Sequence, residues 1–233
     1  MLILNLILRK SGYYLIYLKI GVCVMADEVV KKQNVRTIFW VIGFLGFIML
    51  GYLGIRSYKI SVEKLKINQC RDDLIEMVMN IQDKYRNQRN YGEFDYNKAV
   101  AMKVIPKRMF HPGIKDAIHS YMGGIDFFYS SLDEESPYSA FEISFQGISK
   151  MACMDLFKMD WGTNSGDTLI AVAAFTSPTA SGQLDEIYPS MKQSEIKKKN
   201  IYKANDAKFI SDDKLENICG CKGDKCSLVW KFR

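Results

Sequence analysis

The sequence predicts an α+β protein in which a long N-terminal helix, membrane-spanning in its first half, carries a small folded domain. Three observations lead to this prediction. Residues 37–55 contain no charged side chain and are mostly apolar. Residues 56–89 contain neither glycine nor proline and are charged and amphipathic. Residues 90–233 hold short apolar runs separated by turn residues, which is typical of a small domain of strands and helices.

Length and composition fit one anchor and one domain. The chain has 233 residues, of which 48% are hydrophobic and 25% charged, as in ordinary folded proteins. The net charge of +6 lies partly in small clusters such as Lys197, Lys198 and Lys199. No nucleic-acid motif lies beside this cluster, so we interpret it as a solvated face and do not expect nucleic acid as a partner.

The N-terminal tail, residues 1–36, allows three interpretations. Residues 1–24 are apolar but interrupted by Arg9, Lys10 and Lys19. The first interpretation is a signal peptide that is cleaved near Val24-Met25-Ala26, and the second is a short membrane-associated helix. In the third, translation starts at Met25 and the upstream residues are an artefact. We favour the last, because residues 25–28 look like a cytosolic N-terminus and the better membrane segment follows them.

Residues 37–55 are predicted to cross a membrane. A helix needs about 20 apolar residues to span the bilayer, and this segment is close to that length. The alternative is a buried helix of a soluble protein, but such long helices usually have a polar face. Basic residues lie on both sides, so the positive-inside rule is ambiguous. The simpler topology keeps the short tail inside and places the C-terminal domain outside.

Residues 56–89 are predicted to continue the same helix. Apolar residues recur there at steps of three and four, which places them on one helix face. The two halves together would measure about 75 Å at about 1.5 Å per residue. The alternative is two helices with a bend near Arg56, and in either case the face would pack on the domain. The predicted packing face consists of Ile67, Cys70, Leu74, Val78, Ile81 and Tyr85.

The domain, residues 90–233, is predicted to contain four strands and short helices. Asp95 is the expected N-cap of a helix over residues 96–103, and Ser149 that of a helix over residues 149–159. The latter helix would turn Met151, Ala152, Leu156 and Met159 inward. Residues 177–213 read as a polar surface segment with a short helix near residues 191–198. The predicted strands are residues 125–130, 140–146, 168–175 and 227–232.

Four of the six cysteines lie in this domain, an even number, as oxidised pairs require: Cys153, Cys219, Cys221 and Cys226. A zinc site would more usually show two Cys-x-x-Cys pairs. Cys219 and Cys221 are too close in an extended chain to bond easily. We therefore expect Cys153 to pair with Cys219 or Cys221, and Cys226 with the other. Such bonds would fasten the C-terminal strand to the helix at residues 149–159.

No catalytic site is apparent, so we predict no enzyme, no cofactor and no metal. His111 and His119 lack metal-ligand spacing. A nucleophile pair of Cys153 and His119 is conceivable but has no supporting sequence context. The sequence also lacks a phosphate-binding loop, a dinucleotide fingerprint, a serine nucleophile elbow and a calcium loop.

Several segments of the domain resemble type IVb pilins. Residues 99–109 look like a pilin segment that ends in Pro and then Met, here Pro106 and Met109. Tyr121-Met122-Gly123-Gly124 is similar to an Asn-x-(Tyr/Trp)-Gly-Gly stretch, in altered form. Residues 141–153 resemble the pilin strand, turn and Cys-bearing helix, and residues 160–162 resemble a recurrent Asp-Trp-Gly. The resemblance extends from about residue 38 to the C-terminus and depends on the order and spacing of these segments.

The resemblance implies a type IV pilin-like fold, with the long helix packed on a small antiparallel sheet. It also implies a structural subunit that acts through protein–protein contacts. Its partners would be the membrane, other pilin-like subunits or secretion-machine components, and further copies of itself. The implied location is the bacterial inner membrane, crossed once, with the C-terminal domain in the periplasm or at the cell surface.

One departure from the pilin pattern concerns processing. Type IV prepilins have a Gly, then the processed Phe or Met, and a Glu four residues after that residue. Here Phe44 is followed at that offset by Ile48, and Phe47 by Gly51. The resemblance therefore implies an uncleaved anchor and a minor or accessory subunit of a pilus, secretion or conjugation system. The alternative is a membrane-tethered module that binds DNA, peptidoglycan or another ligand through residues 197–199.

Overall fold

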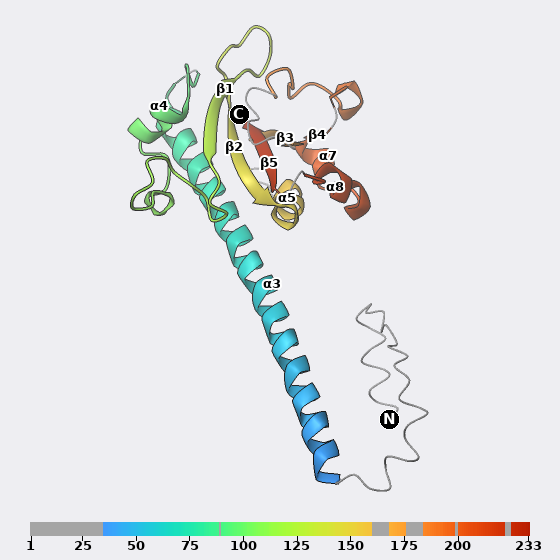
Figure 1. The fold of residues 1–233 in the computed structure, drawn as a ribbon. Coiled ribbons are helices and arrows are strands. Elements are labelled where there is room, and N and C mark those ends of the chain that lie inside the picture. Colours follow the sequence, from blue (N-terminus) through green and yellow to red (C-terminus); the bar gives the residue numbers. More distant parts are fainter. Residues whose placement is uncertain (1–34, 89, 160–167, 176–183, 199, 222–224) are drawn as a thin grey trace. The chain divides into compact units, whose positions relative to one another are not determined.

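The computed structural model describes residues 35–88, 90–159, 168–175, 184–198, 200–221 and 225–233 (Figure 1). The chain separates into two compact units, Met1–Ser57 and Tyr58–Arg233. Helix α3 (Val35–Tyr85) begins in the first unit and ends in the second. It passes Arg56 as one helix and ends four residues before the predicted Arg89. The predicted tail before residue 35 lies outside the described residues.

The second unit contains a five-stranded antiparallel sheet with strand order β1-β2-β5-β3-β4, which confirms the α+β prediction. The C-terminal strand β5 lies at its centre, between β2 and β3. The strands are β1 (Ile125–Ser130), β2 (Ala140–Ser149), β3 (Leu169–Phe175), β4 (Ile201–Lys203) and β5 (Lys225–Phe232).

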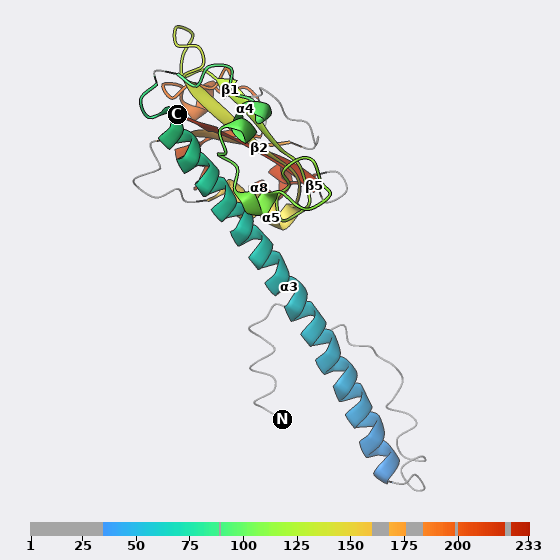
Figure 2. The same cartoon turned by 90° about the vertical axis from the view of Figure 1, so that its left-hand side faces the viewer.

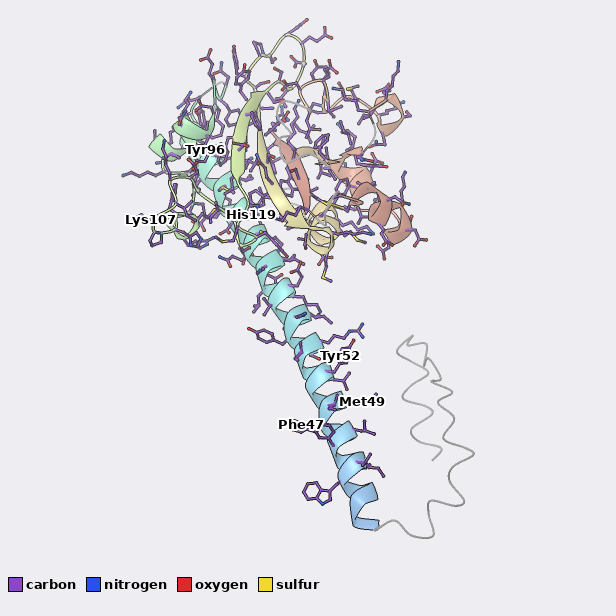
Figure 3. All side chains as sticks on the ribbon, viewed as in Figure 1. Phe47, Met49, Tyr52, Tyr96, Lys107 and His119 are labelled. Atoms are coloured by element: carbon purple, nitrogen blue, oxygen red, sulfur yellow. A yellow bond between two sulfur atoms is a disulfide. The ribbon has the colours of Figure 1, made fainter. Side chains whose placement is uncertain are left out.

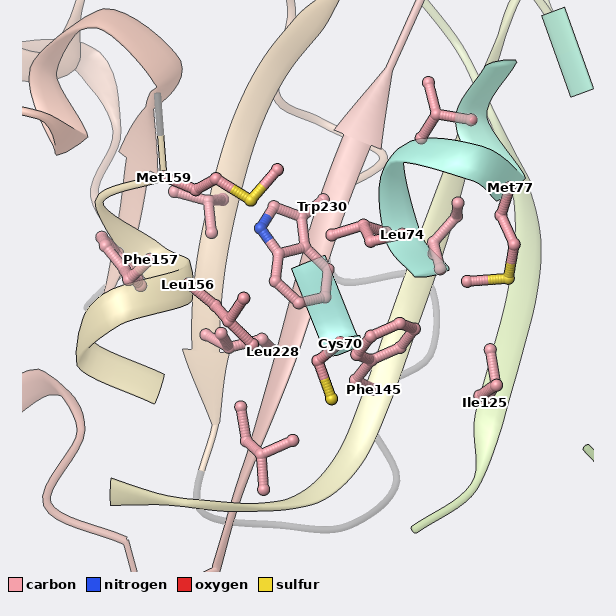
Figure 4. Packing of buried hydrophobic residues seen from close by; sticks show 14 of the residues in the cluster. Cys70, Leu74, Met77, Ile125, Phe145, Leu156, Phe157, Met159, Leu228 and Trp230 are labelled. Atoms are coloured by element: carbon pink, nitrogen blue, oxygen red, sulfur yellow. The ribbon is translucent and has the colours of Figure 1, made fainter. Parts of the chain in front are cut away.

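The main core lies on one face of this sheet, beneath α5 (Lys150–Phe157) and the part of α3 that begins at Tyr58 (Figures 1 and 2). Figure 4 shows Leu74 of α3 and Leu156 of α5 near Trp230, which is completely buried on β5. The Trp230 ring packs edge-to-face on Phe145, with 5.4 Å between ring centroids. A smaller core on the other face includes Leu184 and Ile187.

Side-chain caps start the two short helices that the sequence predicts. An Asp95 carboxylate oxygen accepts the Lys98 N–H at 2.8 Å and opens α4 (Tyr96–Ala101). The Ser149 hydroxyl accepts the Ala152 N–H at 3.1 Å and opens α5. Each cap satisfies a backbone donor that the first helical turn leaves unpaired.

The segment after β3 differs from the prediction. In place of the helix at residues 191–198 there is a single 3₁₀ turn, η2 (Gln193–Glu195). Strand β4 and two short helices, α7 (Ala204–Ala207) and α8 (Asp212–Ile218), were not predicted. Such short elements hold too few residues to show a helical or alternating period. In α5 the side chain of Met151 is 46% exposed, so its predicted inward orientation is wrong, whereas Cys153 and Phe157 are buried.

Candidate functional site

The apolar half of α3 is the first candidate. Between Trp40 and Tyr85 the helix is long and apolar enough to cross a membrane, and its most apolar 18-residue window has a mean hydropathy of 1.5. All side chains from residue 40 to residue 60 are exposed. Figure 3 shows Phe47, Met49 and Tyr52 standing out from the helix. A helix that exposes large apolar side chains all round is suited to lipid, so this segment fits a single-pass membrane anchor.

The second half of α3 presents a different surface. Met77 and all six residues of the predicted packing face, from Ile67 to Tyr85, are buried in the main core. Met77 was not predicted, although it lies three residues after Leu74 and on the same face. The same helix therefore exposes its apolar side chains in the first unit and buries one apolar face in the second, where Leu65 and Met79 stay exposed.

Polar contacts also fasten α3 to the turn at residues 119–121. The Tyr121 hydroxyl donates to a Glu63 carboxylate oxygen at 2.9 Å, and the Ser149 hydroxyl donates to the same oxygen. The Ser120 hydroxyl donates to the Lys66 carbonyl at 2.9 Å. These hydrogen bonds hold the helix where it enters the domain.

His119 has a structural role beside this turn. Its Nδ1 accepts the Tyr121 N–H at 3.2 Å, so the ring proton is on Nε2, which donates to the Gln146 carbonyl at 2.7 Å. The ring stacks on Phe145 at 5.0 Å between centroids. Burial lowers the pKa of His119 to about 4, and the neutral ring is the form that can keep both hydrogen bonds.

Cys70 places a thiol close to His119, with 3.9 Å between Sγ and Nδ1. Burial raises the pKa of the Cys70 thiol to about 11. A neutral thiol beside a neutral imidazole is not an activated nucleophile. The conceivable pair of Cys153 and His119 does not form, because the Cys153 sulfur is bonded to Cys219.

Gly123 closes the turn against strand β2. A Cβ at Gly123 would lie 1.7 Å from the Gln146 carbonyl oxygen and 2.7 Å from Nε2 of His119. Real Cβ atoms do not approach other atoms so closely, so only glycine fits here. The double glycine noted in the sequence is thus explained at its first position by close packing of two backbones.

The structure joins the four distal cysteines as Cys153–Cys219 and Cys221–Cys226. This is one of the two pairings that the sequence left open. The first bond links α5 to the residue after α8, and the second links residues just before and within β5. Both bonds therefore secure the chain that leads into the central strand.

The Asp73 side chain on α3 is buried, with 1% of its surface exposed. Its carboxylate accepts from Nε of Arg108 at 2.6 Å, and a second guanidinium nitrogen of Arg108 contacts Glu76 at 2.7 Å. Burial raises the pKa of Asp73, and the Arg108 cation opposes this rise. Arg108 lies in the 3₁₀ turn η1 (Lys107–Met109), so the ion pair ties this turn to α3.

Two lysines fasten residues 184–189 over the outer face of the sheet. Nζ of Lys231 donates to the carbonyls of Leu184 and Asp185 at 2.9 and 3.1 Å. Nζ of Lys203 donates to the carbonyls of residues 188 and 189 at 2.7 and 3.0 Å. The sequence pattern did not reveal these contacts, although Leu184 and Ile187 are apolar and mark this segment as one that packs on the domain.

The other residues considered from the sequence lie at the surface or outside the described residues. His111 is exposed. Lys197 and Lys198 are exposed, and Lys198 pairs with Glu186 at 3.1 Å. Lys199 and the Asp-Trp-Gly segment at residues 160–162 lie outside the described residues. Among the described His, Cys, Asp and Glu side chains, the group with metal-ligand proximity is Cys153, Cys221 and Cys226, whose sulfurs are in disulfides.

The chain was compared with protein-family models, curated proteins and solved structures, and the matches are to solved structures. No family model and no curated protein matches the chain. Among solved structures, the chain is similar to TcpA, a type IV pilin from Vibrio cholerae El Tor biotype, with 15% sequence identity and a TM-score of 0.41. The similarity covers 72% of this chain and 98% of TcpA.

Proposed function

We propose that this protein is a membrane-anchored, pilin-like structural subunit that acts through protein–protein contacts. We assign it to the minor or accessory components of a pilus, secretion or conjugation system. The observation that carries the proposal is the change of character along α3. Its apolar side chains are exposed from residue 40 to residue 60, and from Ile67 onward one apolar face of the helix enters the core of a domain that contains two disulfides.

The proposed anchor is permanent. Neither Phe44 nor Phe47 is followed four residues later by the Glu that accompanies processing in the proteins this chain resembles. We place the anchor in the bacterial inner membrane and the domain in the periplasm or at the cell surface. The two disulfides support a location of the domain outside the cytosol, because such bonds persist mainly there.

The proposed partners are the membrane, other pilin-like subunits or secretion-machine components, and further copies of the chain. Contacts would run along the exposed part of α3, where a neighbouring apolar helix can replace lipid. The alternative is a tethered module that binds DNA, peptidoglycan or another ligand through residues 197–199, of which Lys197 and Lys198 are exposed and Lys198 pairs with Glu186. The expected absence of enzymatic activity stays a prediction.

A matched pair of double variants tests the anchor. Leu45→Arg with Ile48→Arg places two charges in the proposed span, where the wild-type side chains are 58% and 51% exposed. Leu65→Arg with Met79→Arg is the control, because these side chains are 67% and 63% exposed but lie in the domain unit. Each arginine in a bilayer centre costs about 3 kcal/mol.

We expect alkaline carbonate to release the Leu45/Ile48 variant from membranes, and to leave the wild type and the Leu65/Met79 variant in the membrane pellet. Release of the wild type, or equal retention of both variants, would contradict the anchor. Circular dichroism of the released protein verifies that the domain is folded.

A further inference from the structure

The four distal sulfurs form one cluster although they belong to two disulfides. The Sγ atoms of Cys153, Cys221 and Cys226 all lie within 4.8 Å of one another. Those of Cys221 and Cys226 also lie 3.2 and 3.4 Å from the carbonyl oxygen of Cys219. Each sulfur of the Cys221–Cys226 bond is therefore next to the Cys153–Cys219 bond, within reach of a side-chain rotation.

The four sulfurs differ in access to solvent. Cys153 and Cys219 are completely buried, and Cys226 is 1% exposed. Cys221 is the half-buried member of the cluster. Because thiol–disulfide exchange needs direct attack of a thiolate on a sulfur, an external thiol meets the cluster at Cys221. Direct attack on Cys153 or Cys219 would require the domain to open.

We propose that Cys221–Cys226 is an exchange bond through which a dithiol outside the domain reaches the buried Cys153–Cys219 bond. In the first step a thiolate of the dithiol attacks Sγ of Cys221. The Cys221–Cys226 bond breaks, a mixed disulfide forms at Cys221, and Cys226 leaves as a thiolate.

In the second step the Cys226 thiolate attacks Sγ of Cys153. A Cys153–Cys226 bond forms, the Cys153–Cys219 bond breaks, and Cys219 leaves as a thiolate that takes a proton from solvent. The second thiol of the external dithiol then attacks its own mixed disulfide. This releases Cys221 as a thiol and the dithiol as a cyclic disulfide, so the domain gains two electrons and the dithiol loses two.

The same route in reverse oxidises the domain. The Cys221 thiolate attacks an external disulfide and forms a mixed disulfide with one of its sulfurs. The Cys219 thiolate then attacks Sγ of Cys153 and releases the Cys226 thiolate. Cys226 attacks Sγ of Cys221, which restores both bonds of the domain and releases the external partner as a dithiol. The partner is thus a dithiol–disulfide reagent or an oxidoreductase of that chemistry, and Cys221 is its contact residue. This inference does not depend on the proposed function, because it concerns the domain alone.

Reduction kinetics of the full-length protein test the proposal, with dithiothreitol as the dithiol. The wild type is compared with the Cys221→Ser/Cys226→Ser variant, which keeps the buried bond but lacks the exchange bond. Because the variant can be less stable, the two are compared at urea concentrations that give both the same unfolded fraction. Cys70→Ser, which alters a buried thiol outside the cluster, is the control.

At matched unfolded fraction we expect the Cys153–Cys219 bond to be reduced at least about ten-fold faster in the wild type and in Cys70→Ser than in the double variant. Samples quenched in acid and mapped by mass spectrometry should contain a Cys153–Cys226 cross-link during the wild-type reaction. Equal rates at matched unfolded fraction, or no such cross-link at any time point, would overturn the proposal.

Discussion

Glu142 on β2 lies directly opposite Lys231 on β5, and both side chains are completely buried. The pair sits near the centre of the sheet, on the face that residues 184–189 cover. Nζ of Lys231 donates to the carbonyls of Leu184 and Asp185 in that segment and lies 5.7 Å from the centroid of the Tyr188 ring. The position of residues 184–189 therefore depends on hydrogen bonds from a buried lysine ammonium group.

This burial predicts a stability that depends on pH. Burial raises the pKa of Glu142 to about 7, because the charged form is disfavoured there, from an ordinary value of 4.5. The folded protein then holds a proton that the unfolded chain has already lost. As the pH falls from about 7 to about 4.5, this residue should increase the free energy of unfolding by up to about 1.4 kcal/mol per pH unit.

Urea unfolding of the wild type and Glu142→Gln between about pH 5 and pH 7 measures this effect. The variant lacks the titrating proton, so its pH slope should be smaller than that of the wild type. Asp185, Lys203 and Lys231 also act on this site and are the same in both proteins. An identical slope in both proteins would show that Glu142 does not titrate in this range.

The turn at Gly123 should not tolerate a side chain. Gly123→Ala places a Cβ against the Gln146 carbonyl, so the turn has to move away from β2 and His119 loses its hydrogen bond to that carbonyl. We expect a loss of about 2 kcal/mol or more in the free energy of unfolding. Gly124→Ala is the matched control, because a Cβ there would meet Gln146 at an ordinary 3.5 Å. Denaturant midpoints that shift equally in both variants would contradict the close approach.

The ion pair of Asp73 and Arg108 should matter more than a surface pair. Arg108→Met leaves a carboxylate buried in α3 without its cation, for which we expect a loss of about 1–3 kcal/mol in unfolding free energy. Arg86→Met removes a cation from Asp83, where both side chains are at least 70% exposed. We expect that control to change stability by less than about 0.5 kcal/mol, and equal losses would argue against the buried pair.

The two disulfides should contribute unequally. In the loop-entropy model the Cys153–Cys219 bond, with a sequence separation of 66, contributes about 4 kcal/mol, and Cys221–Cys226, with a separation of 5, about 2 kcal/mol. Replacing both members of a pair by Ala and measuring urea unfolding gives the two values. Cys70→Ala controls for the loss of a buried thiol that forms no bond.

Hydrogen exchange adds a local readout for the same variants. Loss of the Cys153–Cys219 bond should increase amide exchange in β5, because the chain leading into this central strand is released from α5. If β5 keeps its protection and the stability loss is smaller than in the Cys221/Cys226 variant, the Cys153–Cys219 bond is not the one that contributes more to stability.

Local patterns in the sequence predicted much of this fold. The step of three and four residues along α3, the caps at Asp95 and Ser149, and the strand at residues 125–130 each depend on a few neighbouring residues. These signals survive in the folded protein because the long-range packing agrees with them. The elements that were missed, β4, α7 and α8, are short and gain their stability from tertiary contacts.

Other features depend on residues that are distant in the sequence. The buried Asp73 meets Arg108, which lies 35 residues later in the sequence. Glu142 is completely buried because residues 184–189, more than 40 positions later in the sequence, cover its face of the sheet. The choice between Cys219 and Cys221 as partner of Cys153 depends on how the chain turns after α8. The spacing of apolar residues along one helix or strand does not indicate contacts between residues that are distant in the sequence.

The permanent anchor is tested most directly by the N-terminal residue of the mature protein isolated from membranes. Edman degradation or mass spectrometry of the purified full chain identifies it. The anchor predicts an intact N-terminal tail that begins at Met1, Met25 or Ala26. A mature chain that begins at Phe44 or Phe47 would mean processing of the pilin type, and would contradict an anchor that stays uncleaved in the membrane.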